Sequence, residues 1–226
     1  MYTMSQEGNA LVYRWDGEVL SIQPWGENSF RVRSTVLGEL EDTDYALLPA
    51  KEAEAQIQVE EYTARIVNGK ITAVLTVDDW SKSCDIAFYN QKGELLLKER
   101  GRGGALDRKN RFFKPIIGGD YRLTVTFASN PKEKLYGMGQ YQQDILNVKN
   151  CNLELAHRNS QASVPFVLSD LGYGFLWHNP AIGRVSFGSN TTEWYAESTK
   201  QMDYWITAGD TPDEIECAYA AATGTA

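Results

Sequence analysis

Cysteine and histidine are both scarce in this sequence. The three cysteines, Cys84, Cys151 and Cys217, are widely spaced and form no CxxC pair. An odd number without a pairing pattern indicates free, buried thiols, so we expect a reducing, cytoplasmic location. His157 and His178 are the only histidines. No spacing typical of a zinc site, a GxSxG nucleophile or a complete dinucleotide fingerprint is present, and we expect no metal and no cofactor.

Long apolar runs and a basic leader are absent as well. The first 20 residues lack a basic start followed by an apolar run, and no stretch approaches the roughly 18 apolar residues that a membrane span needs. We therefore expect neither secretion nor a membrane partner. The net charge is −8, from 30 acidic and 22 basic residues, and repulsion from phosphates argues against a nucleic-acid partner.

One segment, residues 98–114, departs from this acidic character. It carries most of its charge as lysine and arginine, with Gly101, Gly103 and Gly104 between them. Glycines beside arginines could cradle a phosphate, but the GxxxxGK[ST] pattern of a P-loop is absent. The favoured interpretation is a mobile loop whose arginines pair with acidic neighbours.

Aromatic residues, in contrast, are plentiful. The chain has 6 Trp, 12 Tyr and 8 Phe, which is 12% of its residues. Flat rings stack on the C–H faces of sugars, so this composition permits carbohydrate binding. Most of these rings are nevertheless expected in a sheet core, where aromatic side chains pack well across strands. A hydrophobic content of 42% and a charged content of 23% are typical of a folded globular protein.

Short alternating segments separated by turn residues occupy most of the chain. Asp16-Gly17 and Asn68-Gly69 are strong hairpin signals, joining 11–15 to 19–25 and 57–67 to 71–77. Further strands are expected at 30–34, 84–89, 95–97, 121–127, 164–168, 174–177, 184–187, 192–197 and 202–207. The acidic segment 38–55 is interpreted as a solvated loop. This pattern predicts an all-β protein, an antiparallel β-sandwich, forming one domain over residues 1–226.

A single short helix is expected at residues 211–224. Thr211 and Glu214 have the spacing of a capping box, Pro212 suits the first turn, and Gly224 would end the helix. Its buried stripe would consist of Ile215, Tyr219 and Ala222.

Five motifs follow one another between Leu135 and Gly224. They are Tyr136-Gly137-Met138-Gly139, Ser163–Ser169, Gly172–Phe175, Asp203–Ile206 and Gly209–Ile215. In this order they resemble the N-terminal β-sandwich of glycoside hydrolase family 31, the retaining α-glucosidases and α-xylosidases. The resemblance implies a galactose-mutarotase-like supersandwich whose C-terminal helix leads toward a (β/α)8 barrel.

The resemblance also implies where the chemistry lies. In this family the nucleophile and the acid/base are both aspartates on the barrel, which needs about 250 residues, and this chain stops at Ala226. We therefore expect no catalytic residue and no activity in this chain alone. The implied partners are the C-terminal barrel of the same polypeptide and an α-linked oligosaccharide or glycoside, while the oligomeric state stays open.

Two polar loops are the candidate substrate-binding elements. In the resembled family, loops of the sandwich reach over the barrel mouth, and one often carries an N-x-D segment whose acid contacts sugar hydroxyls. The corresponding residues here, 157–161, lack that acid, although asparagine and glutamine can still bind hydroxyls. The candidates are Gln140, Tyr141, Gln142, Asp144, Arg158, Asn159 and Gln161, with Ser160 between them.

Two alternatives stay open. A free-standing aldose mutarotase, whose sandwich is similar, uses a pair of histidines and a glutamate. That set would be His157, His178 and either Glu154 or Glu193. The second alternative is a stand-alone carbohydrate-binding module with a shallow aromatic face.

Overall fold

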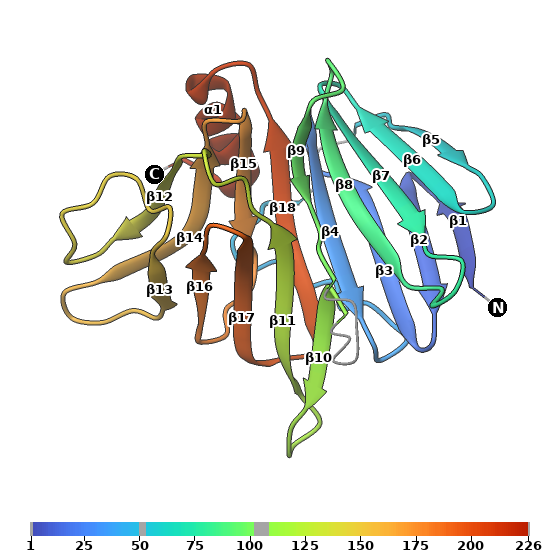
Figure 1. Ribbon diagram of the computed structural model, residues 1–226, viewed down its shortest axis with the longest axis horizontal. Coiled ribbons are helices and arrows are strands. Elements are labelled where there is room, and N and C mark those ends of the chain that lie inside the picture. Colours follow the sequence, from blue (N-terminus) through green and yellow to red (C-terminus); the bar gives the residue numbers. More distant parts are fainter. Residues whose placement is uncertain (1, 50–52, 102–108, 226) are drawn as a thin grey trace.

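The computed structural model describes residues 2–49, 53–101 and 109–225. Three antiparallel sheets form two layers (Figure 1). An eight-stranded sheet of order β1-β2-β3-β4-β18-β15-β14-β12 makes one layer. Two five-stranded sheets, β10-β11-β17-β16-β13 and β5-β6-β7-β8-β9, make the other. The prediction of an all-β sandwich with a short C-terminal helix is confirmed.

The elements have the following bounds. The first nine strands are β1 (Thr3–Glu7), β2 (Ala10–Trp15), β3 (Glu18–Pro24), β4 (Ser29–Thr35), β5 (Gln56–Val59), β6 (Thr63–Asn68), β7 (Ile71–Val77), β8 (Cys84–Asn90) and β9 (Leu95–Lys98). The others are β10 (Arg111–Pro115), β11 (Tyr121–Ala128), β12 (Leu135–Gln140), β13 (Asn152–Leu155), β14 (Ala162–Ser169), β15 (Tyr173–Trp177), β16 (Gly183–Phe187), β17 (Thr191–Thr199) and β18 (Gln201–Ala208). Helix α1 spans Pro212–Thr223.

The predicted turn chemistry is present where the backbone needs it. Asp16 and Gly17 both have positive φ, 50° and 81°, which is the geometry of a two-residue hairpin turn with the twist of its strands. Helix α1 begins as expected, because Glu214 N–H donates to Thr211 Oγ1 at 3.3 Å. The Glu214 carboxylate accepts from Asp210 N–H at 3.0 Å, one residue earlier than an ideal capping box.

The core lies between the two layers and is rich in stacked rings. Trp177 on β15 stacks on Trp194 on β17 with ring centroids 5.7 Å apart. Phe175 stacks on the same tryptophan at 5.1 Å and on Tyr204 at 4.9 Å. One buried apolar cluster includes residues from all three sheets. The prediction that most aromatic residues belong to the sheet core therefore holds for Trp177, Trp194 and Trp205, whereas Trp80 is 95% exposed.

The acidic segment 38–55 packs on part of the outer face of the eight-stranded sheet. Its described residues form a largely exposed loop, as predicted, but a few of them contact the sheet. Arg31 on β4 is fully buried, and its guanidinium pairs with Asp203 and with Asp44, both at 2.7 Å. Trp25 Nε1–H donates to the Leu48 carbonyl at 3.0 Å. Asp42 and Asp44 thus pair with arginines of the sheet, and Leu47 is buried.

Several short strands were not expected from the sequence. These are β1, β10, β12 and β13, and β5 is separated from β6 by a turn at Glu60–Tyr62, where one continuous strand over 57–67 was expected. All five pair with a neighbour. β1, β5 and β10 are largely exposed, so the alternation that identifies a strand is weak in them. β13 alternates but has only four residues, and glycines interrupt the pattern of β12.

The basic segment forms a buried ion pair at its two ends. Arg111 and Glu99 pair inside the sandwich, and Arg111 Nε donates to Glu18 at 2.7 Å. Burial raises the pKa of Glu99 to about 7. The predicted pairing of an arginine with acidic neighbours is therefore present, whereas residues 102–108 lie outside the described part of the chain.

The cysteines are free, but not all are buried. Cys84 is buried, Cys151 is half-buried, and Cys217 is exposed on α1, so the expectation of three buried thiols is wrong for Cys217. No helix among the described residues has the length and apolar character to cross a membrane.

Candidate functional site

Strand β12 reaches the candidate loops through an irregular, glycine-rich backbone. Gly137, Met138 and Gly139 have positive φ values of 111°, 75° and 89°, and the β12–β14 register shifts between the two glycines. A Cβ on Gly137 would lie 2.7 Å from the Phe166 carbonyl oxygen, and one on Gly139 would lie 2.3 Å from that of Ala162. Only glycine fits at positions 137 and 139 of this bulge.

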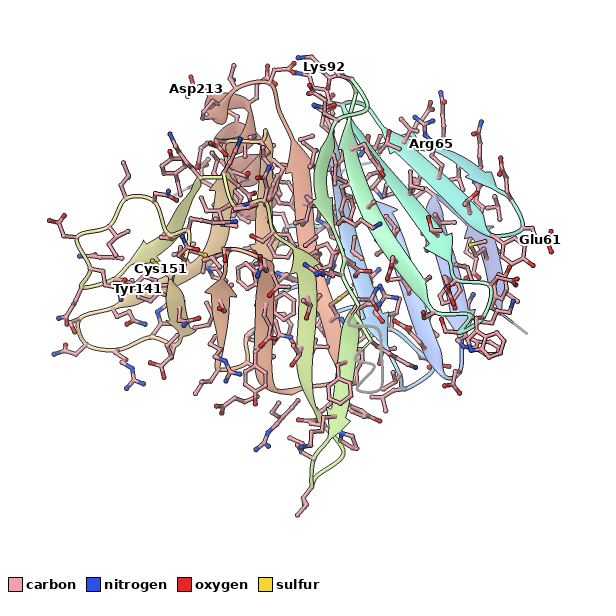
Figure 2. All side chains as sticks on the ribbon, in the orientation of Figure 1. Glu61, Arg65, Lys92, Tyr141, Cys151 and Asp213 are labelled. Atoms are coloured by element: carbon pink, nitrogen blue, oxygen red, sulfur yellow. The ribbon has the colours of Figure 1, made fainter. Side chains whose placement is uncertain are left out.

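Tyr141 connects the two layers at this end of the sandwich. Its hydroxyl donates to the Glu154 carbonyl of β13 at 2.8 Å and lies 3.0 Å from Ser163 Oγ of β14. The ring is partly buried against the main core. Figure 2 shows Tyr141 and Cys151 at the same end of the molecule, opposite Glu61. Tyr141 therefore positions the loop, and its hydroxyl is already engaged.

The second candidate loop is a tight turn between β13 and β14. Arg158 and Gln161 exchange backbone hydrogen bonds of 3.1 Å in both directions. The Arg158 guanidinium binds the Glu154 carboxylate at 2.6 Å, and this hydrogen bond lowers the pKa of Glu154. Gln161 Nε2 donates to the Ala156 carbonyl at 3.0 Å. Arg158 and Gln161 are thus used within the turn.

The structure brings the two loops together. Gln140 at the end of β12 pairs with Ala162, directly after the second loop. Within the described parts of the chain, four candidate side chains are exposed and make no hydrogen bond of their own: Gln140, Gln142, Asp144 and Asn159. Two exposed apolar residues, Ile145 and Leu146, follow them. Amide and carboxylate groups in this arrangement can bind hydroxyls.

Asp144 is exposed in the segment between β12 and β13. Among residues 2–49, 53–101 and 109–225, no group of three or more His, Cys, Asp or Glu side chains has the arrangement of a metal site.

The histidines and glutamates of the mutarotase alternative are not assembled into one site. His178 follows the inward-pointing Trp177, so it points to the outer face of the eight-stranded sheet. There it is buried, and its Nε2 accepts from Tyr45 N–H at 3.3 Å. Glu193 precedes the inward-pointing Trp194 on the opposite layer, so it faces the other side of the sandwich.

Two hollows elsewhere had no sequence signal. A groove of about 690 Å³ lies between α1 and the β3–β4 turn and includes Trp25, Lys70 and Ala218. A second groove of about 620 Å³ lies at the β1 edge and includes Tyr2, Trp15 and Tyr62. Residues of both come from distant parts of the sequence, so no local pattern could reveal them.

The architecture is that of a two-layer antiparallel supersandwich with one C-terminal helix, and comparison with known families identifies it further. Residues 19–185 match the family model described as "Glycosyl hydrolase 31 N-terminal galactose mutarotase-like domain". The chain belongs to this family, which confirms the resemblance found in the sequence.

Known proteins of this kind are considerably longer than the present chain. It is 47% identical to an uncharacterized family 31 glucosidase, ORF2, of Pseudescherichia vulneris, matching 100% of this chain and 45% of that protein. It is 29% identical to alpha-xylosidase A of Aspergillus niger over 87% of this chain and 29% of the other. The chain thus spans less than half the length of these relatives.

A solved structure shows the same fold at high similarity. The GH31 alpha-xylosidase from a soil metagenome, crystallised with xylose, superposes with a TM-score of 0.92 and 50% sequence identity. The match covers 99% of this chain and 35% of that one. A Flavobacterium johnsoniae GH31 dextranase, 16% identical with a TM-score of 0.78, shares the fold.

Proposed function

We propose that this chain is the non-catalytic N-terminal module of a retaining α-glycosidase of the α-xylosidase type. Its two polar loops, residues 140–144 and 157–161, supply one wall of the sugar-binding pocket. The catalytic carboxylates belong to a (β/α)8 barrel in the same polypeptide, where one acts as nucleophile and the other as acid/base. In this proposal the 226-residue chain hydrolyses nothing by itself, and the whole protein acts in the cytoplasm.

The observation that carries the proposal is the convergence of the two loops at one end of the sandwich. Their exposed amides, Gln142 and Asn159, have no partner among the described residues, while neighbouring Tyr141 and Gln161 hold the backbone in place. A fixed loop with unused hydroxyl-binding groups is preorganised for a ligand.

The apolar side chains beside these amides support a packing role for the same end. Leu146 is 81% exposed and Ile145 is 50% exposed. Adjacent exposed apolar residues next to a polar rim are typical of a surface that another domain covers. Helix α1 lies in the same half of the molecule as β12 and β14 (Figure 1), so one partner domain can contact both.

Kinetics of the full-length gene product test the proposal. We expect it to release xylose from an α-xyloside, and we expect the 226-residue chain to release none. In the full-length protein, Gln142→Ala and Asn159→Ala should each raise KM about two- to tenfold for an α-xylosyl disaccharide, the value of one hydrogen bond. Gln58→Ala, an exposed change on β5, is the matched control and should leave KM unchanged.

Two results would contradict the proposal. Hydrolysis by the 226-residue chain would place catalysis in the sandwich itself. An unchanged KM in both loop variants of an active full-length protein would mean that the two loops do not contact the sugar.

A further inference from the structure

The β1 edge of the sandwich carries an aromatic groove that the proposed function does not use. Its walls come from the β1–β2 hairpin and from a turn distant from it in sequence: Tyr2 just before β1, Met4 on β1, Trp15 at the end of β2, and Tyr62 in the β5–β6 turn. Lys82 closes one side. Glu61, in the same turn as Tyr62, lies at the edge of the molecule opposite Tyr141 (Figure 2).

The rings of this groove are fixed by contacts to the backbone. The Tyr2 hydroxyl donates to the Glu61 carbonyl, and the Tyr2 and Tyr62 ring centroids are 6.4 Å apart at 43°. Lys82 Nζ lies 5.9 Å from the Tyr2 centroid and 5.5 Å from that of Tyr62. The two rings therefore meet at an angle around one ammonium group.

Polar groups border the rings on the same side. Glu60 and Glu61 line the groove. The Glu61 carboxylate makes no hydrogen bond among the described residues, and the Glu60 carboxylate accepts only from Thr63 Oγ1 at 3.2 Å. The groove thus combines half-exposed ring faces, carboxylate acceptors and the Lys82 ammonium group, which also pairs with Asp79 at 2.5 Å. This mixture suits a ligand with C–H faces and many hydroxyls.

The charges around the groove favour one kind of ligand over others. Glu60 and Glu61 line it, and Asp79 pairs with Lys82, so three carboxylates against one ammonium disfavour a phosphate or nucleic acid. A second copy of this chain would bring a net charge of −8 to an already acidic edge. A neutral saccharide carries no charge, so these carboxylates do not repel it. The volume of about 620 Å³ is within the range of small-molecule sites.

We propose that this groove is a second saccharide-binding site, for a neutral oligosaccharide of glucose or xylose units, at the edge opposite the pocket-wall loops. The sugar class rests on the proposed function, whereas the site does not include any residue of the two loops. Such a site would hold a glycan chain near the enzyme while another part of it enters the catalytic pocket.

Titration of the 226-residue chain with isomaltotriose, followed by amide chemical shifts, tests the proposal. We expect saturable shifts at residues 2–4, 60–62 and 80–82. Tyr62→Leu removes the ring but keeps an apolar side chain and should weaken binding about tenfold, whereas Tyr62→Phe keeps the ring and should bind within about twofold of the parent. Ile117→Ala, a fully exposed apolar change in the β10–β11 turn, is the matched control and should change nothing.

The outcomes separate this site from the proposed pocket wall. Chemical-shift changes confined to residues 140–161 would overturn the proposed second site and leave the proposed function intact. The same conclusion would follow if sugar caused no shift change at either edge while the full-length protein remained active. Equal binding by Tyr62→Leu and the parent would also overturn it. If Tyr62→Leu instead abolished self-association seen by sedimentation, with no shift on sugar addition, the groove would be an interface between copies and the proposal would be wrong.

Discussion

Phe166 and Tyr219 stack face to face, with ring centroids 3.9 Å apart and an interplanar angle of 12°. The first ring belongs to β14, the strand that continues from the second candidate loop, and the second belongs to α1. Together with Ile215 and Trp205 they form an apolar cluster on the outer face of the eight-stranded sheet. The helix is therefore anchored to the same strand that carries the loop.

Loss of this stacked pair should destabilise the chain. Tyr219→Ala removes a half-buried ring, and we expect the free energy of unfolding to fall by about 2 kcal/mol, below the full core value because the ring is partly exposed. Urea denaturation measures it. Glu216→Ala, an exposed change on the same helix, should stay within about 0.5 kcal/mol of the parent. Equal losses in both variants would mean that the stacking contributes nothing.

Position 139 in the β12 bulge should tolerate no side chain. Gly139→Ala puts a Cβ against the Ala162 carbonyl at 2.3 Å, so we expect an unfolding free energy at least about 2 kcal/mol lower than that of Gly118→Ala. Gly118 also has a positive φ, 108°, but open space around it, so it carries only the backbone penalty. Thermal denaturation of the two variants compares them directly, and similar melting temperatures would contradict the steric argument.

The stability contributed by His178 should depend on pH. Burial lowers the pKa of His178 to about 4, and Arg31 adds to this, while Asp44 opposes it and Arg33 lowers it further. His178 therefore stays neutral in the native state at pH values below 6.5, where the histidine of the unfolded chain becomes protonated. The stability that neutral His178 contributes is fully present above pH 6.5. As the pH falls toward 4, the free energy of unfolding decreases by at most about 3 kcal/mol.

The comparison with His178→Gln isolates this effect. Glutamine can still accept from Tyr45 N–H but does not titrate. We expect the stability difference between the parent and the variant to increase from pH 4 to pH 6.5 and to stay constant above that. Asp203, whose pKa burial raises to about 6, is present in both proteins, so its opposite trend is shared. A pH-independent difference would show that His178 is not the responsible group.

Removing the cation from the buried pair of Arg111 and Glu99 should destabilise the protein more than neutralising the acid. Arg111→Met would leave the carboxylates of Glu99 and Glu18 without their cation, and we expect a loss of about 3–5 kcal/mol. Glu99→Gln keeps Arg111 paired with Glu18 at 2.7 Å and should cost less. Equilibrium unfolding at pH 8 measures both. A larger loss in the glutamine variant would contradict this account of the cluster.

Local signals account for most of the fold that the sequence predicts. Asp16-Gly17 fixes one hairpin through positive φ at both residues, Gly69 supplies a positive φ in the turn of another, and Thr211 fixes the start of α1, because each acts within a few residues. The strand β1 was missed since its exposed and half-exposed residues carry little alternation. In β13, Leu153 and Leu155 alternate with exposed residues, but the strand is only four residues long. The burial of Arg31 was missed for another reason: it depends on Asp203, 172 residues away, and sequence alone does not show that contact.

The candidate site was predicted in part for the same reasons. The two loops were located by motif order, and the pairing of Gln140 with Ala162 brings them together as the proposal requires. The structural use of Tyr141 and Gln161 was not foreseen, because it depends on backbone carbonyls of β13 and of the residue after it. The aromatic groove at the β1 edge depends on three separate strands and turns, so it has no counterpart in the sequence pattern.

A crystal structure of the full-length protein with an α-linked disaccharide tests the central claim most directly. The distance to measure is that between the sugar hydroxyls and the side-chain amides of Gln142 and Asn159. We predict at least one direct hydrogen bond, about 3 Å long, with both loops bordering the barrel mouth. A disaccharide bound in the barrel with both loops far from it would contradict the claim.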